Sequence, residues 1–100
     1  MNAIEISNAA ATGEMPDDLS PLEKTLWFAK AGHWHKAHDL CQELKKAPGA
    51  WIHAWLHRQE GDYGNACYWY SVAGKPATPQ DDSLEKEWFR IAEEVLSQKS

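Results

Sequence analysis

Apolar residues recur along most of this chain at the spacing of amphipathic helices. The clearest case is residues 34–46, where apolar positions follow i, i+3, i+7 and i+10 along one stripe of a helical surface. No stretch shows the apolar–polar alternation that is typical of a half-buried strand. The pattern therefore predicts an all-α fold of five helices. They are expected at about 21–31, 34–46, 50–60, 63–73 and 82–97.

Capping residues mark several of these predicted ends. Ser20 and Glu23 have the spacing of a capping box, which predicts a helix start. Gly32 predicts the end of that helix, because glycine readily takes the left-handed conformation of a C-cap. Asp62 is placed to cap the helix that follows it. The Ala-Pro-Gly sequence at 47–49 is predicted to break the chain between two helices.

Residues 1–19 differ from the remainder of the chain. They carry four acidic residues and no lysine or arginine, are rich in small and polar residues, and show no sustained apolar period. We interpret them as a flexible acidic N-terminal arm. The remaining helices are expected to form a single domain over residues 20–98.

Composition and charge exclude several classes of partner. The chain has 100 residues, enough for one domain, and a formal net charge of −5 with no basic stripe of the kind that nucleic-acid binders carry. No apolar run is long enough to span a bilayer, and the amino terminus lacks the pattern of a secretory signal. We therefore expect no nucleic-acid or membrane partner, and a cytoplasmic location in which Cys41 and Cys67 stay reduced.

Catalytic motifs are missing from the sequence. The serines lack the glycine context of a nucleophile elbow, and there is no glycine-rich phosphate loop. Glu60 and Asp62 flank Gly61 and are interpreted as helix-end residues. We therefore expect no enzymatic activity and no cofactor.

The segment 61–73 repeats the segment 32–44 at a spacing of 29 residues. Each copy has a glycine turn, an aromatic residue and then a small residue on the same helical face. The paired positions are Gly32 and Gly61, Trp34 and Tyr63, Ala37 and Ala66, Cys41 and Tyr70, and Leu44 and Ala73. Self-similarity of this period predicts two antiparallel helical hairpins, with the last helix closing the open face of the stack.

The second copy resembles the second helix of a tetratricopeptide repeat, in which a Gly-Asp-Tyr turn is followed by alanine, an aromatic residue and alanine. These residues are Gly61, Asp62, Tyr63, Ala66, Tyr70 and Ala73. The first copy matches less well, because His33 replaces the aspartate and Cys41 the aromatic residue. The period of 29 residues is also shorter than the family's usual period. The resemblance implies an α-α superhelix that binds proteins. The run from Trp51 to Arg58 also looks like that of small uncharacterised bacterial helical proteins, which implies no function.

The resemblance places Trp51 and Trp55 on the concave face of the superhelix, with Arg58 and Lys30 at its end. An aromatic floor with cationic ends suits a peptide that carries a carboxylate. The alternative is that the C-terminal helix covers the two tryptophans, which are then part of the core.

All five histidines lie within residues 33–57. His53 and His57 are spaced i, i+4, which puts both rings on one helical face, as at many metal sites. A metal would need a third ligand from the segment 33–43, which contains three histidines, Asp39 and Glu43. Exposed histidines, or histidines paired with helix ends and carboxylates, are the alternative.

The sequence therefore supports two functions. The first is a non-catalytic protein-interaction module that binds a peptide or protein partner through Lys30, Trp51, Trp55 and Arg58. The second is a histidine-based protein that binds a metal or small ligand through His53 and His57. Whether the chain forms a homodimer stays open.

Overall fold

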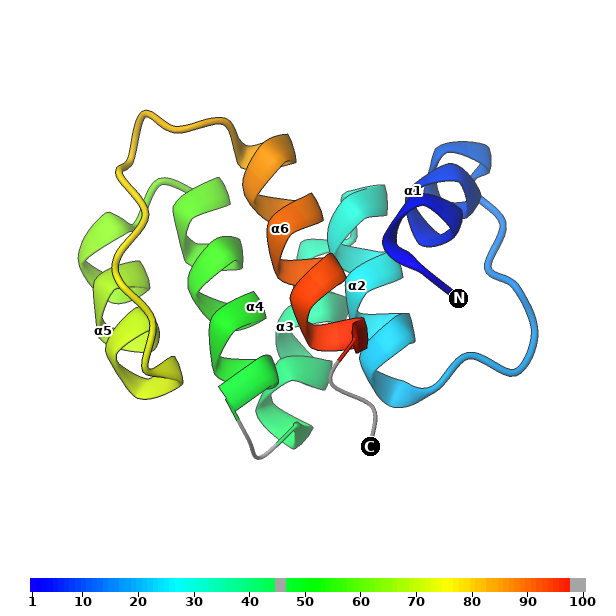
Figure 1. Cartoon of the computed structure of the whole chain (residues 1–100), viewed down its shortest axis with the longest axis horizontal. Coiled ribbons are helices and arrows are strands. Elements are labelled where there is room, and N and C mark those ends of the chain that lie inside the picture. Colours follow the sequence, from blue (N-terminus) through cyan, green and yellow to red (C-terminus); the bar gives the residue numbers. More distant parts are fainter. Residues whose placement is uncertain (45–46, 98–100) are drawn as a thin grey trace.

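The computed structural model describes residues 1–44 and 47–97, and the only regular structure in these residues is helical (Figure 1). The helices are α1 (Ala3–Thr12), α2 (Pro21–Ala31), α3 (Trp34–Glu43), α4 (Ala47–Gln59), α5 (Tyr63–Ala73) and α6 (Leu84–Ser97). The predicted all-α class is confirmed. The prediction of five helices is wrong, because the described part of the chain contains six.

Helices α2 and α5 begin and end where their capping residues predict. Ser20 Oγ accepts a hydrogen bond from the Glu23 amide at 3.1 Å, and the Glu23 carboxylate accepts one from the Ser20 amide at 2.8 Å. Gly32 ends α2 with a φ of 90°, in the left-handed region that glycine enters at no steric cost. Asp62 accepts from the Asn65 amide at 3.3 Å and so caps α5.

The predicted break at residues 47–49 is wrong, since these residues form the first turn of α4. Proline is compatible with a first turn because the amide hydrogen that it lacks would have no helical partner there. Gly49 has a packing role instead. A Cβ atom at this position would lie 2.4 Å from the Leu44 carbonyl oxygen, so only glycine lets the start of α4 pass so close to the end of α3.

The predicted flexible arm is wrong for residues 3–12, which form α1 and pack against α2 and α6. Ala3, Ile6 and Ala10 share one helical face and are buried, and the Ile6 side chain is fully enclosed. Asn2 and Glu5 form a capping box at the start of this helix. The mostly small, polar composition obscured this short apolar stripe.

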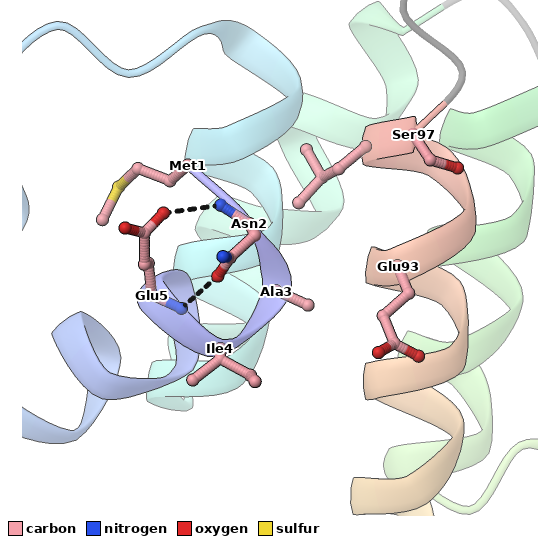
Figure 2. Close-up of a pocket in the computed structure, with 8 residues that line it drawn as sticks. Met1, Asn2, Ala3, Ile4, Glu5, Glu93 and Ser97 are labelled. Atoms are coloured by element: carbon pink, nitrogen blue, oxygen red, sulfur yellow. Dashed lines mark hydrogen bonds between the residues drawn. The ribbon is translucent and has the colours of Figure 1, made fainter.

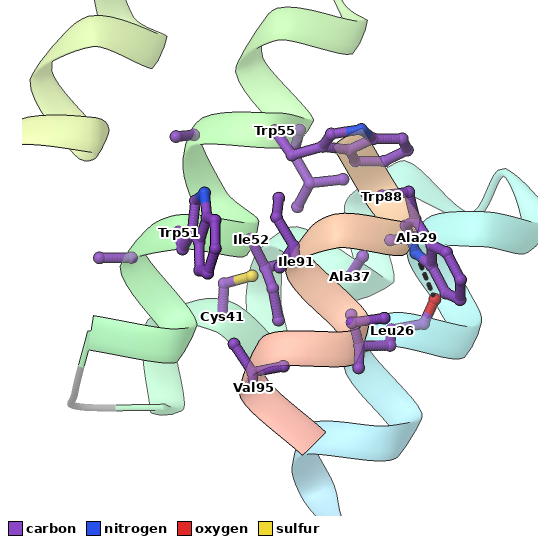
Figure 3. Close-up of a cluster of buried hydrophobic side chains, with 14 of the residues drawn as sticks. Leu26, Ala29, Ala37, Cys41, Trp51, Ile52, Trp55, Trp88, Ile91 and Val95 are labelled. Carbon is purple, nitrogen blue, oxygen red and sulfur yellow. Dashed lines mark hydrogen bonds between the residues drawn. The ribbon is translucent and has the colours of Figure 1, made fainter. Parts of the chain in front are cut away.

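Helices α2 and α3 pack as one hairpin and α4 and α5 as a second, while α6 lies across α2 and α4 (Figures 1 and 3). Trp88, Ile91 and Val95 of α6 point into the core between these helices (Figure 3). Each large side chain buried in this way stabilises the fold by about 1.5–3 kcal/mol. The small residues expected at close helix contacts are fully buried. They are Ala37, Ala54 and Ala66.

In the part of the chain that the structure describes, no helix combines the length and apolar character needed to cross a bilayer.

Candidate functional site

The predicted peptide groove is closed in the structure. Trp51 and Trp55 are 6% and 4% exposed, because α6 packs on α4 and Lys75 of the preceding loop lies over Trp51, with Nζ 4.3 Å from the centre of the ring (Figure 3). The Trp55 indole donates a hydrogen bond to the Leu84 carbonyl at the start of α6, at 2.8 Å. Lys30 is half-buried, with Nζ 5.8 Å from the centre of the Trp88 ring. The prediction that these residues line an open binding surface is therefore wrong.

Arg58 belongs to a buried polar network rather than to a binding surface. Its guanidinium forms an ion pair with Glu87 of α6 and donates to the Gln80 and Asp82 carbonyls of the preceding loop. Glu87 is fully buried and also accepts from the hydroxyls of Tyr70 and Thr78. Opposite charges and hydrogen bonds thus hold α6 and its loop against α4 and α5. We call these residues the arginine network.

A second buried polar group lies on another face of α4. His53 and His57 converge there with His38 of α3, so that one ring nitrogen from each lies within 4.8 Å of the other two. The Nε2 atoms of His38 and His53 are 2.9 Å apart. His53 and His57 are buried and His38 is half-buried. We call these three residues the histidine cluster.

The fold brings the histidine cluster together in two ways. The i, i+4 spacing places His53 and His57 on one face of α4, and their rings stack with centroids 4.8 Å apart. Packing of α3 against α4 adds His38. The other two histidines, His33 and His35, are exposed and lie outside the cluster.

Two tryptophans fix the rings of His38 and His53. The Trp34 ring stacks on His38 at a centroid distance of 4.7 Å, and its indole N–H donates to the Leu56 carbonyl at 2.8 Å. The Trp69 ring of α5 stacks on His53 at 3.9 Å. The Trp34 indole is fixed by its hydrogen bond to α4, and the two stacking contacts limit how far the imidazoles can rotate.

A carboxylate fixes the third ring. His57 Nδ1 lies 2.7 Å from Glu60 Oε2, one helical turn further along α4. An ionised carboxylate only accepts hydrogen bonds, so Nδ1 is the donor and carries a proton. In the tautomer that has its single proton on Nδ1, the Nε2 lone pair can bind a ligand.

Burial favours the neutral form of two imidazoles in the cluster. Burial, reinforced by the neighbouring His38 and His57, lowers the pKa of His53 to about 4. Burial and His57 also lower the pKa of His38. Neutral imidazole is the form that binds metal ions, and both shifts favour it at neutral pH. Because the Nε2 atoms of His38 and His53 share a hydrogen bond, one of them carries the proton in the metal-free protein.

A neighbouring set of His57, Glu60 and Asp62 also has donor atoms within 4.8 Å of one another. Its two carboxylates already have structural roles, because Glu60 holds His57 and Asp62 caps α5. We therefore regard this set as support for the histidine cluster and not as a separate site.

A separate cleft lies between the start of α1 and the end of α6 (Figure 2). It has a volume of about 520 Å³, and its lining includes Ile4, Glu93 and Leu96 but no histidine or cysteine. The Asn2 and Glu5 side chains at its edge are used in the α1 capping box (Figure 2). This cleft has no convergent chemistry comparable with that of the histidine cluster.

Comparisons with known proteins find no family model, no curated protein and no solved structure that matches this chain.

Sequence reasoning identified part of the site. His53 and His57 were predicted to share a face and do so, but His38 was only one of several candidates for a third ligand. Glu60 was interpreted as a helix-end residue, although its i, i+3 spacing from His57 indicates the contact. The stacking of Trp69 on His53 crosses between helices and left no local signal.

Proposed function

We propose that this chain binds a divalent transition-metal ion through His38, His53 and His57, as a binding protein without catalytic activity. The observation that carries the proposal is the convergence of three imidazoles, each held by a partner outside the cluster. Imidazole ligands suit zinc, copper and nickel, whereas calcium and magnesium prefer oxygen.

The spacing of the nitrogens fits such an ion. Zinc lies about 2.0–2.1 Å from histidine nitrogens, so two nitrogens on one tetrahedral ion are roughly 3.3 Å apart. The distance of 2.9 Å between the Nε2 atoms of His38 and His53 would increase by a few tenths of an ångström. A ring nitrogen that lies up to 4.8 Å from another would move toward it by roughly 1.5 Å. Metal binding therefore requires small shifts of the imidazole rings from their positions in the metal-free structure.

The proposed scaffold is a pair of tetratricopeptide-like hairpins, α2–α3 and α4–α5, with α6 as the capping helix. The paired glycine turns at Gly32 and Gly61 and the buried alanines at the helix contacts support this arrangement. A cytoplasmic location is proposed as well, and the free thiols of Cys41 and Cys67 support it.

Metal titration tests the proposal. We expect the wild-type protein to bind one equivalent of Zn²⁺ in competition with a chromophoric chelator. His38→Ala should weaken Zn²⁺ binding at least about tenfold, because the loss of a metal ligand lowers the affinity more than the loss of a residue that only contacts a ligand. His35→Ala is the matched control, since His35 lies on the same helix but is exposed. No binding by the wild-type protein, or an equal loss in both variants, would contradict the proposal.

A second candidate function is protein interaction through the outer face of α5. Tyr68 and Val72 are 60% and 52% exposed there, although the opposite face of α5 packs on α4. Large exposed apolar side chains that lie one turn apart favour a protein partner. Sedimentation of the wild-type protein and of a Tyr68→Ser, Val72→Ser variant tests whether a second copy is that partner. Self-association that the variant loses would support it, and a monomer at all concentrations would exclude it.

A further inference from the structure

We propose that Glu60 is a positioning residue for the metal site, through its contact with His57. This inference rests on the proposed metal-binding function. The contact joins a ligand that is 5% exposed to a carboxylate at the surface end of α4. Glu60 thereby connects the buried histidine cluster to solvent.

The contact has two consequences for His57. First, the 2.7 Å hydrogen bond from Nδ1 to Glu60 Oε2 fixes which ring nitrogen carries the proton and leaves Nε2 to bind the metal. Second, the negative carboxylate draws the Nδ1 proton toward itself and increases the electron density of the ring. Both effects make Nε2 a stronger and better oriented donor.

Glu60 itself is held in place by the backbone. Its amide donates to the Leu56 carbonyl at 3.1 Å, which continues the helical pattern of α4 to this residue. Gly61 then turns the chain at a φ of 89° toward α5. The carboxylate therefore starts from a defined point one turn beyond His57.

Asp62 provides a matched comparison. It lies two residues further along and carries the same charge, but its carboxylate accepts from the Asn65 amide at 3.3 Å and from the Asn65 side chain at 3.4 Å. Asparagine is also a good N-cap residue, so Asp62→Asn removes a nearby charge without removing the cap. Glu60→Gln removes the same charge together with the ionic contact to His57.

The experiment measures Zn²⁺ affinity by chelator competition, and the visible spectrum of the Co²⁺ form, for the wild-type protein and both variants. Glu60→Gln should weaken Zn²⁺ binding roughly 10- to 100-fold and shift the Co²⁺ absorption bands, because the donor strength of His57 changes. Asp62→Asn should change the affinity less than about threefold. Thermal unfolding of the metal-free proteins should be similar, which separates positioning from folding.

The outcomes distinguish the two proposals. If the wild-type protein binds no Zn²⁺, the metal-binding function is wrong, and the role of Glu60 is wrong with it. If the wild-type protein binds Zn²⁺ and the two variants have equal affinities, the site exists but Glu60 does not position His57. X-ray absorption that shows a carboxylate ligand lost in Glu60→Gln would make Glu60 a ligand itself and overturn the positioning role.

Discussion

The arginine network and the histidine cluster are both buried and polar, and they include adjacent residues of α4. Arg58 faces α6, where it meets an opposite charge and carbonyl oxygens. His57 belongs to a group of like side chains that face α3 and α5. The arginine network is made of complementary groups, whereas the histidine cluster gathers three groups of the same kind.

This difference indicates different roles. A buried charge is tolerated when an opposite charge and hydrogen bonds compensate for its desolvation, as Glu87 does for Arg58. Three imidazoles cannot compensate one another in this way, because protonating one disfavours protonation of the next. The 2.9 Å contact between the Nε2 atoms of His38 and His53 needs a proton on one of them, and a cation could take its place if that proton moved to Nδ1. The comparison therefore indicates a structural role for the arginine network, and it supports our proposal that the histidine cluster binds a ligand.

The largest effect is expected from Arg58→Ala. Removing the guanidinium leaves Glu87 as an unpaired charge at a fully buried position, which should cost about 3–5 kcal/mol of unfolding free energy. Urea denaturation measures this loss. Arg90→Ala on the exposed side of α6 is the control and should change stability by less than about 0.5 kcal/mol. If Arg58→Ala loses little unfolding free energy, the arginine network does not stabilise the fold, and its contrast with the histidine cluster fails.

Acid is expected to destabilise the metal-free protein through the histidine cluster. His53 has a pKa of about 4 in the folded protein, against an ordinary value of 6.5 in the unfolded chain. Below pH 6.5 the unfolded chain therefore binds a proton that the folded protein does not, so stability falls as the pH falls from 6.5 to 4. The loss should be roughly 1–3 kcal/mol. Urea denaturation at several pH values measures it.

His53→Gln sharpens the acid experiment, because it removes the titrating ring and should flatten the pH dependence. His35→Ala should keep the dependence, since His35 is exposed. A slope that is the same in all three proteins would place the acid sensitivity outside the cluster.

A smaller effect is expected from Trp69→Leu. Leucine fills much of the space but cannot stack on His53, and a stacked pair contributes about 0.5–1.5 kcal/mol. Zn²⁺ affinity should therefore fall roughly two- to tenfold. Chelator competition measures this change, with Trp27→Leu as a control, because the Trp27 ring stacks on His33 outside the cluster. Equal affinities in both variants would show that stacking does not organise the site.

Local signals accounted for most of the fold. The helix ends at Ser20, Gly32 and Asp62 follow from short-range capping chemistry, and the structure has them where they were predicted. Helix α1 was missed although Asn2 and Glu5 form a capping box, because alanines make up much of its buried stripe. Alanine has the highest helix propensity but adds little to an apolar pattern. Burial of Ile6 depends on packing of α1 against α2 and α6.

The site was less predictable than the fold. The spacing of His53 and His57 is a property of one helix, but the approach of His38 depends on how α3 packs against α4. The same limit applies to Trp51 and Trp55. Their pattern fits either a groove or a core, and only the position of α6 decides between them.

Anomalous diffraction from crystals grown with stoichiometric Zn²⁺ tests the central claim most directly. Data collected on both sides of the zinc absorption edge locate the ion without reference to the protein density. We predict one strong peak that lies about 2.0–2.1 Å from a ring nitrogen of each of His38, His53 and His57. A peak at the surface, or a histidine cluster that keeps its hydrogen bonds and binds no ion, would contradict the claim.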